Sequence, residues 1–261
     1  MLSLYDRIRW NSKITKLCYA KKVYKSSVPP KITLSMCVKN EASAYLSKML
    51  SSCKEYIDYA VIIDDASADN TVEVCEQILN SVPHTIVKNK ISLFATEWKL
   101  RMLQWAETIK TKPEWILFLD ADQIFEDSFK LQIRDILSSD ESICVYKFRL
   151  YDMWDDCHYR SDPLWTAHHH YEAFMLRYDP SFKYFFTRKT NQHCGHMPSN
   201  VKYLKSRCSD LRLKHYGWAN EEKRKEKFNR YMELDPEGKD GSFLKYQSVL
   251  DENCHLVEWF E

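Results

Sequence analysis

Glycine is scarce in this sequence of 261 residues. Only four glycines are present, at positions 195, 217, 238 and 241, so the first 194 residues contain none. The P-loop and the GxGxxG dinucleotide-binding turn both need glycine backbone between a strand and a helix. The sequence therefore excludes a P-loop nucleotide hydrolase and a glycine-rich dinucleotide-binding dehydrogenase. A phosphate bound by this part of the chain must be held in another way.

Net charge and long apolar runs are also missing. Lysine and arginine total 38 and the acidic residues total 37, which leaves a net charge of +1. This balance gives no global attraction to nucleic acid or to an acidic partner. No apolar run approaches the roughly 20 residues of a membrane span, and no secretory signal is evident. We therefore expect a cytoplasmic protein.

Paired cysteine motifs are absent as well. The nine cysteines are an odd number and include no CxxC pair, so we expect free thiols. A structural zinc site built from His168–His170, His193, Cys194 and His196 is an alternative interpretation. It is disfavoured because these residues lack the paired spacing of zinc ligands.

Strand and helix patterns alternate between residues 31 and 150. Strands are expected at 33–38, 59–64, 84–89, 115–119 and 143–150, and four helices between them at 41–56, from near Asp69, around 98–109 and at 128–137. This alternation predicts an α/β domain with a mostly parallel central sheet flanked by helices.

The pattern changes after residue 150. An aromatic- and histidine-rich stretch from about 151 to 210 predicts no clear element, and a strand-like run follows at 211–218. A helix is then expected from an Asn220 cap to Pro236. Its charged run KRKEK, residues 223–227, predicts a solvated helix face.

Polar residues follow three of the predicted strands. These are KNE at 39–41, DDAS at 64–67 and DAD at 120–122, and the carboxyl ends of parallel strands meet at one edge of a sheet. Asp120 and Asp122 lie two positions apart in extended backbone and therefore point to the same side. Paired carboxylates suit Mg²⁺ or Mn²⁺, which keep positions open for substrate phosphates. A solvated turn with a capping role is the alternative interpretation.

The order and spacing of these motifs resemble a known family. KITLSMCVKNE, VIIDDASADNT and EWILFLDADQIF follow one another as in family-2 glycosyltransferases, over residues 31–150. The later segments YDMWDDCHYRSDPLW, QHCGHMPSN and LKHYGWANEEKRKEKFNRYMELDP are similar to a bacterial subgroup of that family. The resemblance implies a GT-A-type nucleotide-sugar-binding fold in residues 31–150. It also implies an acceptor-side region of the same catalytic domain in residues 151–261.

The resemblance assigns several residues to the nucleotide. Asn40 and Glu41 would lie near the nucleotide, and Asp65 would accept a hydrogen bond from the base. Arg101 would lie near the nucleotide or its phosphates. The implied donor is a nucleoside-diphosphate sugar, a UDP-sugar.

A second group of residues is assigned to the metal of the DxD motif. Asp120 would approach the ribose and the metal shell, with Ala121 beside it in the nucleotide-sugar site. Asp122 would bind the ion directly, and His215 would supply a further ligand. An imidazole ligand favours Mn²⁺ over Mg²⁺, whose shell prefers oxygen throughout.

The family implies inversion at the anomeric carbon, so a carboxylate must take the acceptor's proton. Acids in the expected window are Asp152, Asp155, Asp156, Asp162 and Glu172. We favour Asp162, followed by Asp156. A surface acid beside an arginine or tyrosine is the alternative for each.

Two departures from the family pattern affect donor preference or metal affinity. Gln123 stands where many relatives have glutamate, and Lys39 stands where a small or aromatic residue is usual. Two other functions remain as alternatives. A sugar nucleotidyltransferase usually needs a glycine-rich loop, which is absent, and a non-catalytic sugar-nucleotide or partner-binding module would be expected to lack the metal ligands. The acceptor, a glycan, a lipid or a peptide, does not follow from the residues.

The first 30 residues form a basic extension with seven basic side chains and one acid. One interpretation is peripheral contact with the inner membrane face, where anionic lipids attract basic segments. The other is a solvated extension that packs on the catalytic domain. Aromatic residues such as Tyr151, Trp154, Trp165 and Tyr171 line an acceptor groove in one interpretation and belong to the core in the other.

Overall fold

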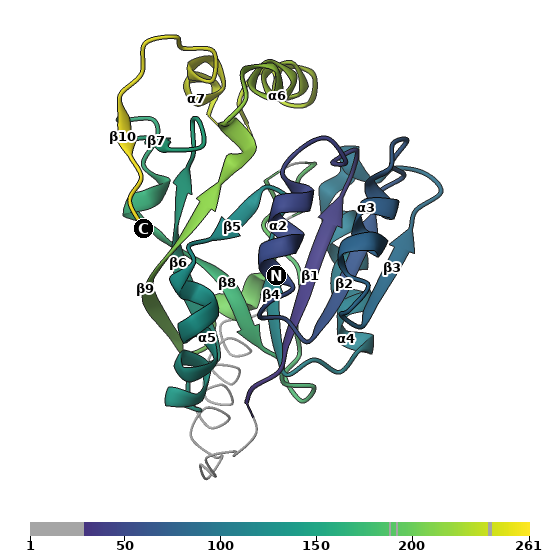
Figure 1. Cartoon of the computed structure of the whole chain (residues 1–261). Helices are drawn as coiled ribbons and strands as arrows, with labels where there is room; N and C mark the ends of the chain where they lie inside the picture. Colours follow the sequence, from purple (N-terminus) through teal and green to yellow (C-terminus); the bar gives the residue numbers. More distant parts are fainter. Residues whose placement is uncertain (1–28, 188, 192, 240–241) are drawn as a thin grey trace, which may run out of the picture.

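An eight-stranded sheet forms the centre of the chain (Figure 1). Its strands lie in the order β3-β2-β1-β4-β8-β6-β9-β5. The computed structural model describes residues 29–187, 189–191, 193–239 and 242–261. The strands of the sheet are β1 (Ile32–Val38), β2 (Tyr59–Asp64), β3 (His84–Lys88), β4 (Trp115–Phe118), β5 (Gln123–Phe125), β6 (Val145–Asp152), β8 (Tyr171–Arg177) and β9 (Ser206–His215). A separate two-stranded sheet pairs β7 (His158–Arg160) with β10 (Leu256–Glu258).

Most neighbouring strands of the large sheet run in the same direction. The pairs β2–β3, β1–β2, β1–β4 and β6–β9 are parallel, whereas β8 is antiparallel to β4 and β6, and β5 is antiparallel to β9. Only β5 and β8 therefore run against the other strands of this sheet. The predicted α/β fold with a mostly parallel sheet is confirmed.

Helices cover both faces of the sheet. Their bounds are α2 (Leu46–Cys53), α3 (Thr71–Ile78), α4 (Glu97–Lys110), α5 (Ser128–Ser139), α6 (Glu221–Leu234) and α7 (Phe243–Ser248). Successive side chains of a strand point to opposite faces. Ala60 and Ile62 of β2 accordingly join the core cluster that contains α2, α3 and α5, while Val61 and Ile63 pack with Leu100 of α4. Helices α2, α3 and α5 therefore lie on one face of the sheet and α4 lies on the other.

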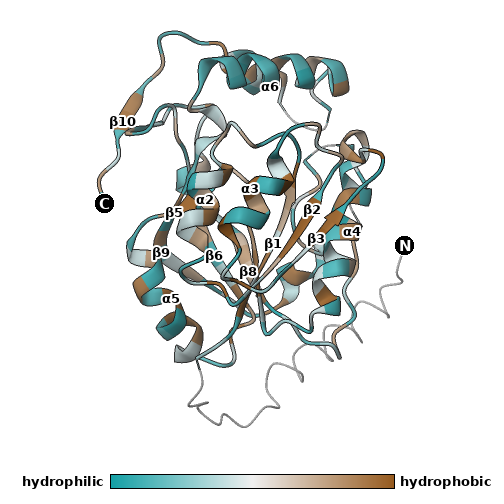
Figure 2. Cartoon of the chain, turned by 45° about the vertical axis from the view of Figure 1, so that its right-hand side comes forward, coloured by the Kyte–Doolittle hydropathy of each residue, from teal (hydrophilic) through white to brown (hydrophobic). Residues whose placement is uncertain are grey.

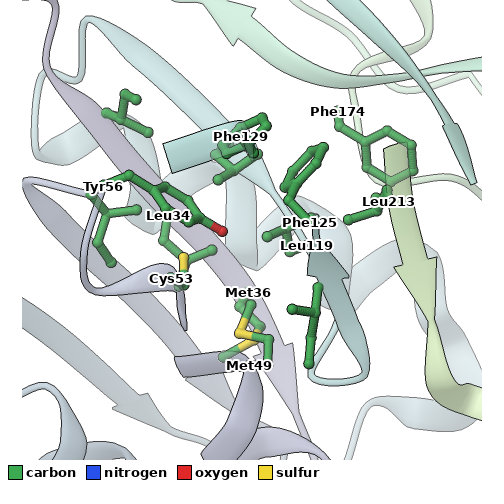
Figure 3. Close-up of a cluster of buried hydrophobic side chains, with 14 of the residues drawn as sticks. Leu34, Met36, Met49, Cys53, Tyr56, Leu119, Phe125, Phe129, Phe174 and Leu213 are labelled. Atoms are coloured by element: carbon green, nitrogen blue, oxygen red, sulfur yellow. The ribbon is translucent and has the colours of Figure 1, made fainter. Parts of the chain in front are cut away.

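The larger core cluster explains the position of α2. Leu46, Met49, Leu50 and Cys53 recur at helical spacing, and each is at most 1% exposed. Figure 3 shows Met49 beside Met36 of β1 in this cluster. The predicted helical stripe is confirmed, because its apolar side chains all pack against the sheet.

Strand β8 occupies the sequence segment for which no element was predicted. It lies between β4 and β6, so the predicted strand at 143–150 forms as β6 but does not pair with β4. Tyr171 and Glu172 are exposed, whereas the consecutive residues Phe174, Met175 and Leu176 are buried. Because exposed and buried residues do not alternate along β8, its sequence lacks the period-two signal of a half-buried strand.

The strand-like run predicted at 211–218 was wrong in its bounds. Strand β9 begins earlier, at Ser206, and ends at His215, while Tyr216–Trp218 forms a 3₁₀ turn. Four of the first five residues of β9 are exposed and the fifth, the buried Ser209, is polar, which removes the hydrophobic signal.

The two predicted helix starts have different outcomes. Asn220 caps α6 as predicted, because its side chain accepts a hydrogen bond from the backbone NH of Lys223 at 3.1 Å. Helix α3 begins at Thr71 and not at Asp69. Asp69 still accepts a hydrogen bond from the backbone NH of Thr71 at 3.0 Å, so it satisfies a donor of the first turn.

Some predictions concern residues beyond the described part. Residues 1–28 of the predicted basic extension lie outside it, and they include Cys18. The other eight cysteines are free thiols, as expected. Within the described ranges, every helix is too short or too polar to span a lipid bilayer.

Candidate active site

Six of the predicted site residues follow the carboxyl ends of β1, β2 and β4, namely Asn40, Glu41, Asp65 and Asp120–Asp122. These three strands are parallel neighbours, so their ends meet at one edge of the sheet. Helix α6 passes over this edge and is largely hydrophilic (Figure 2). The charged groups described below lie near these strand ends and α6.

His215 lies between two carboxylates. Its Nδ1 is 2.8 Å from Oδ1 of Asp152, and its Nε2 is 3.6 Å from Oδ2 of Asp122. The side chain of Trp218 donates a second hydrogen bond to the same Asp152 oxygen, at 3.1 Å. Both carboxylates are largely buried. Asp122 and His215 are therefore brought together as the sequence predicted, and Asp152 holds the ring from the other side.

Strand pairing fixes this arrangement. His215, the last residue of β9, pairs with Asp152 at the end of β6 and with Gln123 at the start of β5. The backbone NH of Tyr216 donates to the carbonyl of Asp122 at 2.8 Å, which extends the pairing by one residue. Asp122 and Asp152 are thus placed on either side of His215 by the register of three strands.

The close charges shift the pKa values of all three groups. Burial alone would lower the pKa of His215, but Asp122 and Asp152 outweigh burial and raise it to about 9. Burial raises the pKa of the Asp122 carboxyl, yet the charges of His215 and Lys227 hold it well below its usual range. For Asp152, the hydrogen bond with His215 likewise outweighs burial and lowers the pKa. The cluster therefore binds positive charge strongly.

Lys227 of α6 is a further member of this cluster. Its Nζ lies 3.4 Å from Oδ2 of Asp122 and 4.5 Å from the centre of the Trp218 ring, and the side chain is only 19% exposed. The prediction that residues 223–227 form a solvated helix face was therefore wrong for Lys227. Its position four residues before the buried Tyr231 places it on the inward stripe of α6, which is the signal that the mixed charge run concealed.

Gly217 lets these charged groups come close to its backbone. A Cβ atom added to Gly217 would lie 2.6 Å from both Oδ2 of Asp122 and Nε2 of His215, and would also overlap Nζ of Lys227. Any side chain at this position would fill the region onto which the three polar atoms converge. The glycine is thus required here by close approach and not by its backbone conformation.

Asp120 faces a different set of partners from Asp122. The prediction of extended backbone here was wrong, because the chain turns after Asp120 and the backbone NH of Gln123 donates to the Asp120 carbonyl at 3.1 Å. Its Oδ1 accepts a hydrogen bond from Nη2 of Arg101 at 3.3 Å, and its Oδ2 lies 3.5 Å from Nε2 of His196. Gln123 also contacts Asp120, since its Oε1 accepts from the Asp120 backbone NH at 3.0 Å. Burial raises the pKa of the Asp120 carboxyl, but His196 and Arg101 outweigh burial and lower it. Asp120 thus keeps its negative charge beside two basic side chains.

Arg101 is held in place by its own helix. Its Nε contacts Glu97 at 3.2 Å and its Nη1 donates to Gln104 at 3.1 Å. Glu97 also accepts from the backbone NH of Cys194 at 3.2 Å, which ties the segment before His196 to α4. The sequence offered His196 only in the disfavoured zinc cluster and in the QHCGHMPSN segment, because its contact with Asp120 depends on the path of the chain after β8.

Asn40, Glu41 and Asp65 lie in the loops after β1 and β2. The backbone of Asn40 has a positive φ of 54°, and its side chain accepts from the NH of Ala68 at 2.8 Å. The backbone NH of Glu41 donates to Thr71 at 2.7 Å. Burial, followed by the charge of Asp122, raises the pKa of Glu41 to about 7. The negative charge of Asp122 therefore affects the pKa of Glu41, although the two side chains are not in direct contact.

Asp65 is completely buried and fully engaged. It accepts hydrogen bonds from Asn89 at 2.8 Å, from Ser92 at 2.6 Å and from the backbone NH of Leu93 at 2.8 Å. In this arrangement Asp65 anchors the chain that follows β3. Its predicted contact with a nucleotide base stays a prediction. Ala121, predicted beside the nucleotide sugar, is buried between Asp120 and Asp122.

The two favoured general bases have very different surroundings. Asp162 accepts from Nε of Arg160 at 2.6 Å and from the backbone NH of Leu164 at 2.9 Å. Burial raises its pKa, but the bond with Arg160 outweighs burial and lowers it. Asp156 is 70% exposed and lies 3.6 Å from Nζ of Lys48. Lys48 in turn lies over the ring of Tyr216, next to His215.

The other residues considered in the sequence analysis lie apart from the Asp122 cluster. They are two further candidate bases, the histidines of the alternative zinc site and the aromatic residues of the alternative acceptor groove. Asp155 binds His158, and Glu172 lies exposed on β8. The His168 ring packs against Tyr151 and Tyr159, whereas His193 packs against Tyr231 and Tyr246. Of the proposed groove aromatics, Tyr151, Trp154 and Trp165 are buried in the core, and Tyr171 is exposed.

The donor set fits a divalent ion held jointly by the protein and a substrate. Across the described ranges, no three His, Cys, Asp and Glu side chains are grouped as ligands of one ion, and Asp120 is not part of the Asp122–His215 pair. Two ligand atoms about 2.1 Å from one ion lie ~3 Å apart in octahedral geometry, so the 3.6 Å between Asp122 Oδ2 and His215 Nε2 would shorten by roughly half an ångström around an ion. A carboxylate and an imidazole that is hydrogen-bonded through its other nitrogen form a recurrent metal-binding pair.

The class of the protein follows from a family model that matches more than half of the chain. Residues 33–197, 165 of the 261 in the chain, match the model of the glycosyl transferase family 2. The chain therefore belongs to glycosyl transferase family 2. The family resemblance predicted from the motifs is confirmed.

Individual relatives are more distant. The chain is 24% identical over 213 residues to the uncharacterized protein Rv3786c of Mycobacterium tuberculosis, and to Mb3815c of Mycobacterium bovis to the same extent. These alignments cover 78% of this chain and 51% of each relative, so the chain spans about half their length. The crystal structure of S. aureus TarS in complex with UDP is similar in fold, with a TM-score of 0.50, 11% identity, and coverage of 84% of this chain and 69% of that chain.

Proposed function

We propose that this chain transfers a sugar from a nucleoside-diphosphate sugar, a UDP-sugar, to an acceptor hydroxyl, with inversion at the anomeric carbon. Membership of glycosyl transferase family 2 supports the class of reaction. S. aureus TarS, which is similar in fold, was crystallised in complex with UDP, and this supports a uridine nucleotide here.

The observation that carries the proposal is the cluster around Gly217. Asp122, His215 and Asp152 gather at the carboxyl edge of a mostly parallel sheet, and the missing side chain of Gly217 lets Asp122 and His215 come close to its backbone. Open α/β sheets bind ligands at this edge. Without a glycine-rich loop, a diphosphate would be held through side chains and a divalent ion, and Asp122 and His215 of this cluster are candidate ligands for that ion.

Each charged residue then has a defined task. Asp122 and His215 would hold the divalent ion, for which the imidazole favours Mn²⁺ over Mg²⁺. When bound, the ion supplies positive charge that stabilises the departing diphosphate. Asp152 orients His215 through Nδ1, and Arg101 with His196 orients Asp120 for a contact with the ribose.

The acceptor step needs a base. The acceptor oxygen forms the new bond to the anomeric carbon, the bond from that carbon to the diphosphate oxygen breaks, and the diphosphate leaves with the bonding electrons. A carboxylate takes the acceptor's proton. Of the two bases favoured from the sequence, the contacts now support Asp156 over Asp162. Asp156 is solvent-accessible near Tyr216, whereas Asp162 is engaged by Arg160 and has a lowered pKa.

A donor panel tests the proposal. Thermal shift and slow donor hydrolysis would be measured with UDP-, GDP-, CMP- and dTDP-sugars, each with and without Mn²⁺. We expect a Mn²⁺-dependent shift with the UDP-sugars that is lost in Asp122→Asn. Asp135→Asn is the matched control, because Asp135 is an exposed carboxylate on α5.

Other results would favour the competing functions. A UDP-sugar that shifts the melting temperature but is never hydrolysed or transferred would favour a non-catalytic binding module. Formation of a UDP-sugar from a sugar phosphate and UTP would favour a nucleotidyltransferase. A folded protein with no response to any donor would contradict the proposal.

A further inference from the structure

Lys227 is the one cation from α6 that reaches the Asp122 cluster in the part of the chain that the structure describes. Its Nζ lies 3.4 Å from the Asp122 oxygen that also faces His215. The other lysines of its charge run form pairs on the helix surface, Lys223 with Glu226 and Lys225 with Glu221. Lys227 is therefore placed to act on the site, unlike its neighbours.

The ammonium of Lys227 converges on the same small space as the two proposed metal ligands. A Cβ added at Gly217 would collide with Lys227 Nζ as well as with Asp122 Oδ2 and His215 Nε2. A cation bound by both Asp122 and His215 would therefore lie within a few ångströms of the ammonium and would be strongly repelled by it. Buried carboxylates need a countercharge, and Lys227 provides one for Asp122.

The side chain of Lys227 is able to move away from Asp122. Four flexible methylene groups let an ammonium move several ångströms without movement of its helix. Its present position over the Trp218 ring, at 4.5 Å from the ring centre, keeps the ammonium at the edge of the cluster. The diphosphate of a donor bound there would bring new negative charge to the same edge.

We propose that Lys227 and a divalent ion are alternative partners of the Asp122 carboxylate, and that Lys227, once displaced, contacts the diphosphate of the donor. This inference rests on the proposed function. Lys227 then protects the carboxylate cluster before the donor binds and becomes a donor-binding residue afterwards. Removal of the ammonium has two opposite effects: metal binding tightens and diphosphate binding weakens.

Two binding measurements test this inference with the full chain. Isothermal titration with Mn²⁺ alone measures the first effect, and titration with UDP at saturating Mn²⁺ measures the second. In Lys227→Met we expect the Kd for Mn²⁺ to fall about tenfold and the Kd for UDP to rise about tenfold, as expected for a partly solvated charge pair. Lys227→Arg should retain wild-type-like Mn²⁺ affinity, since it keeps the charge.

Lys225→Met is the matched control, because it removes the same charge from the same helix on its exposed side. It should leave both constants unchanged. Weaker or unchanged Mn²⁺ binding by folded Lys227→Met would overturn the competition. Tighter Mn²⁺ binding with unchanged UDP binding would keep the competition and overturn the diphosphate contact. Because the Mn²⁺ titration uses no nucleotide, it decides the competition even if the protein proves to bind no sugar nucleotide.

Discussion

The two ring nitrogens of His215 have different tasks. Nδ1 is 2.8 Å from Asp152, and Nε2 faces Asp122 at 3.6 Å. A hydrogen bond from Nδ1 to a carboxylate orients the ring so that Nε2, once it has lost its proton, presents its lone pair to a metal ion. Asp152, which the sequence offered only as one of five acids for the general base, is better explained as the residue that orients His215.

The first prediction concerns this orientation. Asp152→Asn should weaken Mn²⁺ binding about 10- to 100-fold, because the loss of an outer carboxylate both misorients the imidazole and lowers its basicity. The Kd would be measured by titration with Mn²⁺ in the absence of nucleotide. Asp155→Asn, which removes a carboxylate bound to the half-exposed His158, should leave it unchanged. Equal Mn²⁺ affinity in wild type and Asp152→Asn would show that Asp152 does not act through His215.

Glu41 supplies a prediction about pH. Burial and Asp122 raise its pKa from 4.5 to about 7, so the folded protein retains a proton that the unfolded chain has released. This group therefore stabilises the fold most at low pH, and that contribution is lost as the pH rises from about 4.5 through 7. In EDTA, the free energy of unfolding of Glu41→Gln should exceed that of wild type at pH 8 by about 1–2 kcal/mol more than it does at pH 5. Urea unfolding at the two pH values measures this difference, and an equal difference at both would contradict it.

At the scale of elements, the end of α4 carries an unfavourable residue. Lys112 follows the last turn of α4 with a positive φ of 51° and is exposed. Glycine adopts this conformation without the strain that a Cβ causes, and helices commonly end with glycine in this position. We expect Lys112→Gly to raise the free energy of unfolding by about 0.5–1 kcal/mol. Lys110→Gly, inside the same helix, should lower it by about 1 kcal/mol. Chemical denaturation distinguishes the two, and a loss of stability in both variants would contradict the assignment.

Elements also explain how far the sequence could predict the structure. The strands β1, β2 and β4 and the stripe of α2 are buried runs with clear periods, and they were predicted closely. Asp122 and His215 could be paired through the family motifs. The contact of Asp152 with His215 could not, because it depends on β6 lying parallel to β9 with β8 on its other side. The inward position of Lys227 was not predicted, because the mixed charges of residues 223–227 concealed its helical spacing from the buried Tyr231.

Across the whole molecule, Arg160 joins the C-terminal segment to the chain after β6. It is 3% exposed, and its guanidinium binds Asp162 at 2.6 Å, the carbonyl of Ser248 at 2.6 Å and Asp251 at 2.8 Å. The same group lies 4.7 Å from the ring centre of Trp154. Asp162 is therefore part of a structural network, in agreement with its weaker case as the general base.

This network leads to a stability prediction. Arg160→Met should lower the free energy of unfolding by about 3 kcal/mol, because it leaves the Asp162 carboxylate and the Ser248 carbonyl without their buried partner. Arg207→Met removes an exposed pair with Asp140 and should cost at most about 1 kcal/mol. Urea unfolding curves of the two variants and of wild type would measure both changes. Similar losses in the two variants would show that the Arg160 network contributes no more than a surface ion pair.

The register of β9 also has a consequence for the way in which the chain reaches this fold. Asp152 and His215 are 63 positions apart, and they meet only when β9 has paired along β6. Pairing over such separations is slow, since a long loop must close before any contact compensates for its lost entropy. During refolding, Mn²⁺ binding should therefore appear later than the tryptophan fluorescence of the core, as stopped-flow measurements of both signals would reveal. Simultaneous appearance would mean that β9 pairs early. In either case, the time at which Mn²⁺ binding appears would report when β9 pairs along β6.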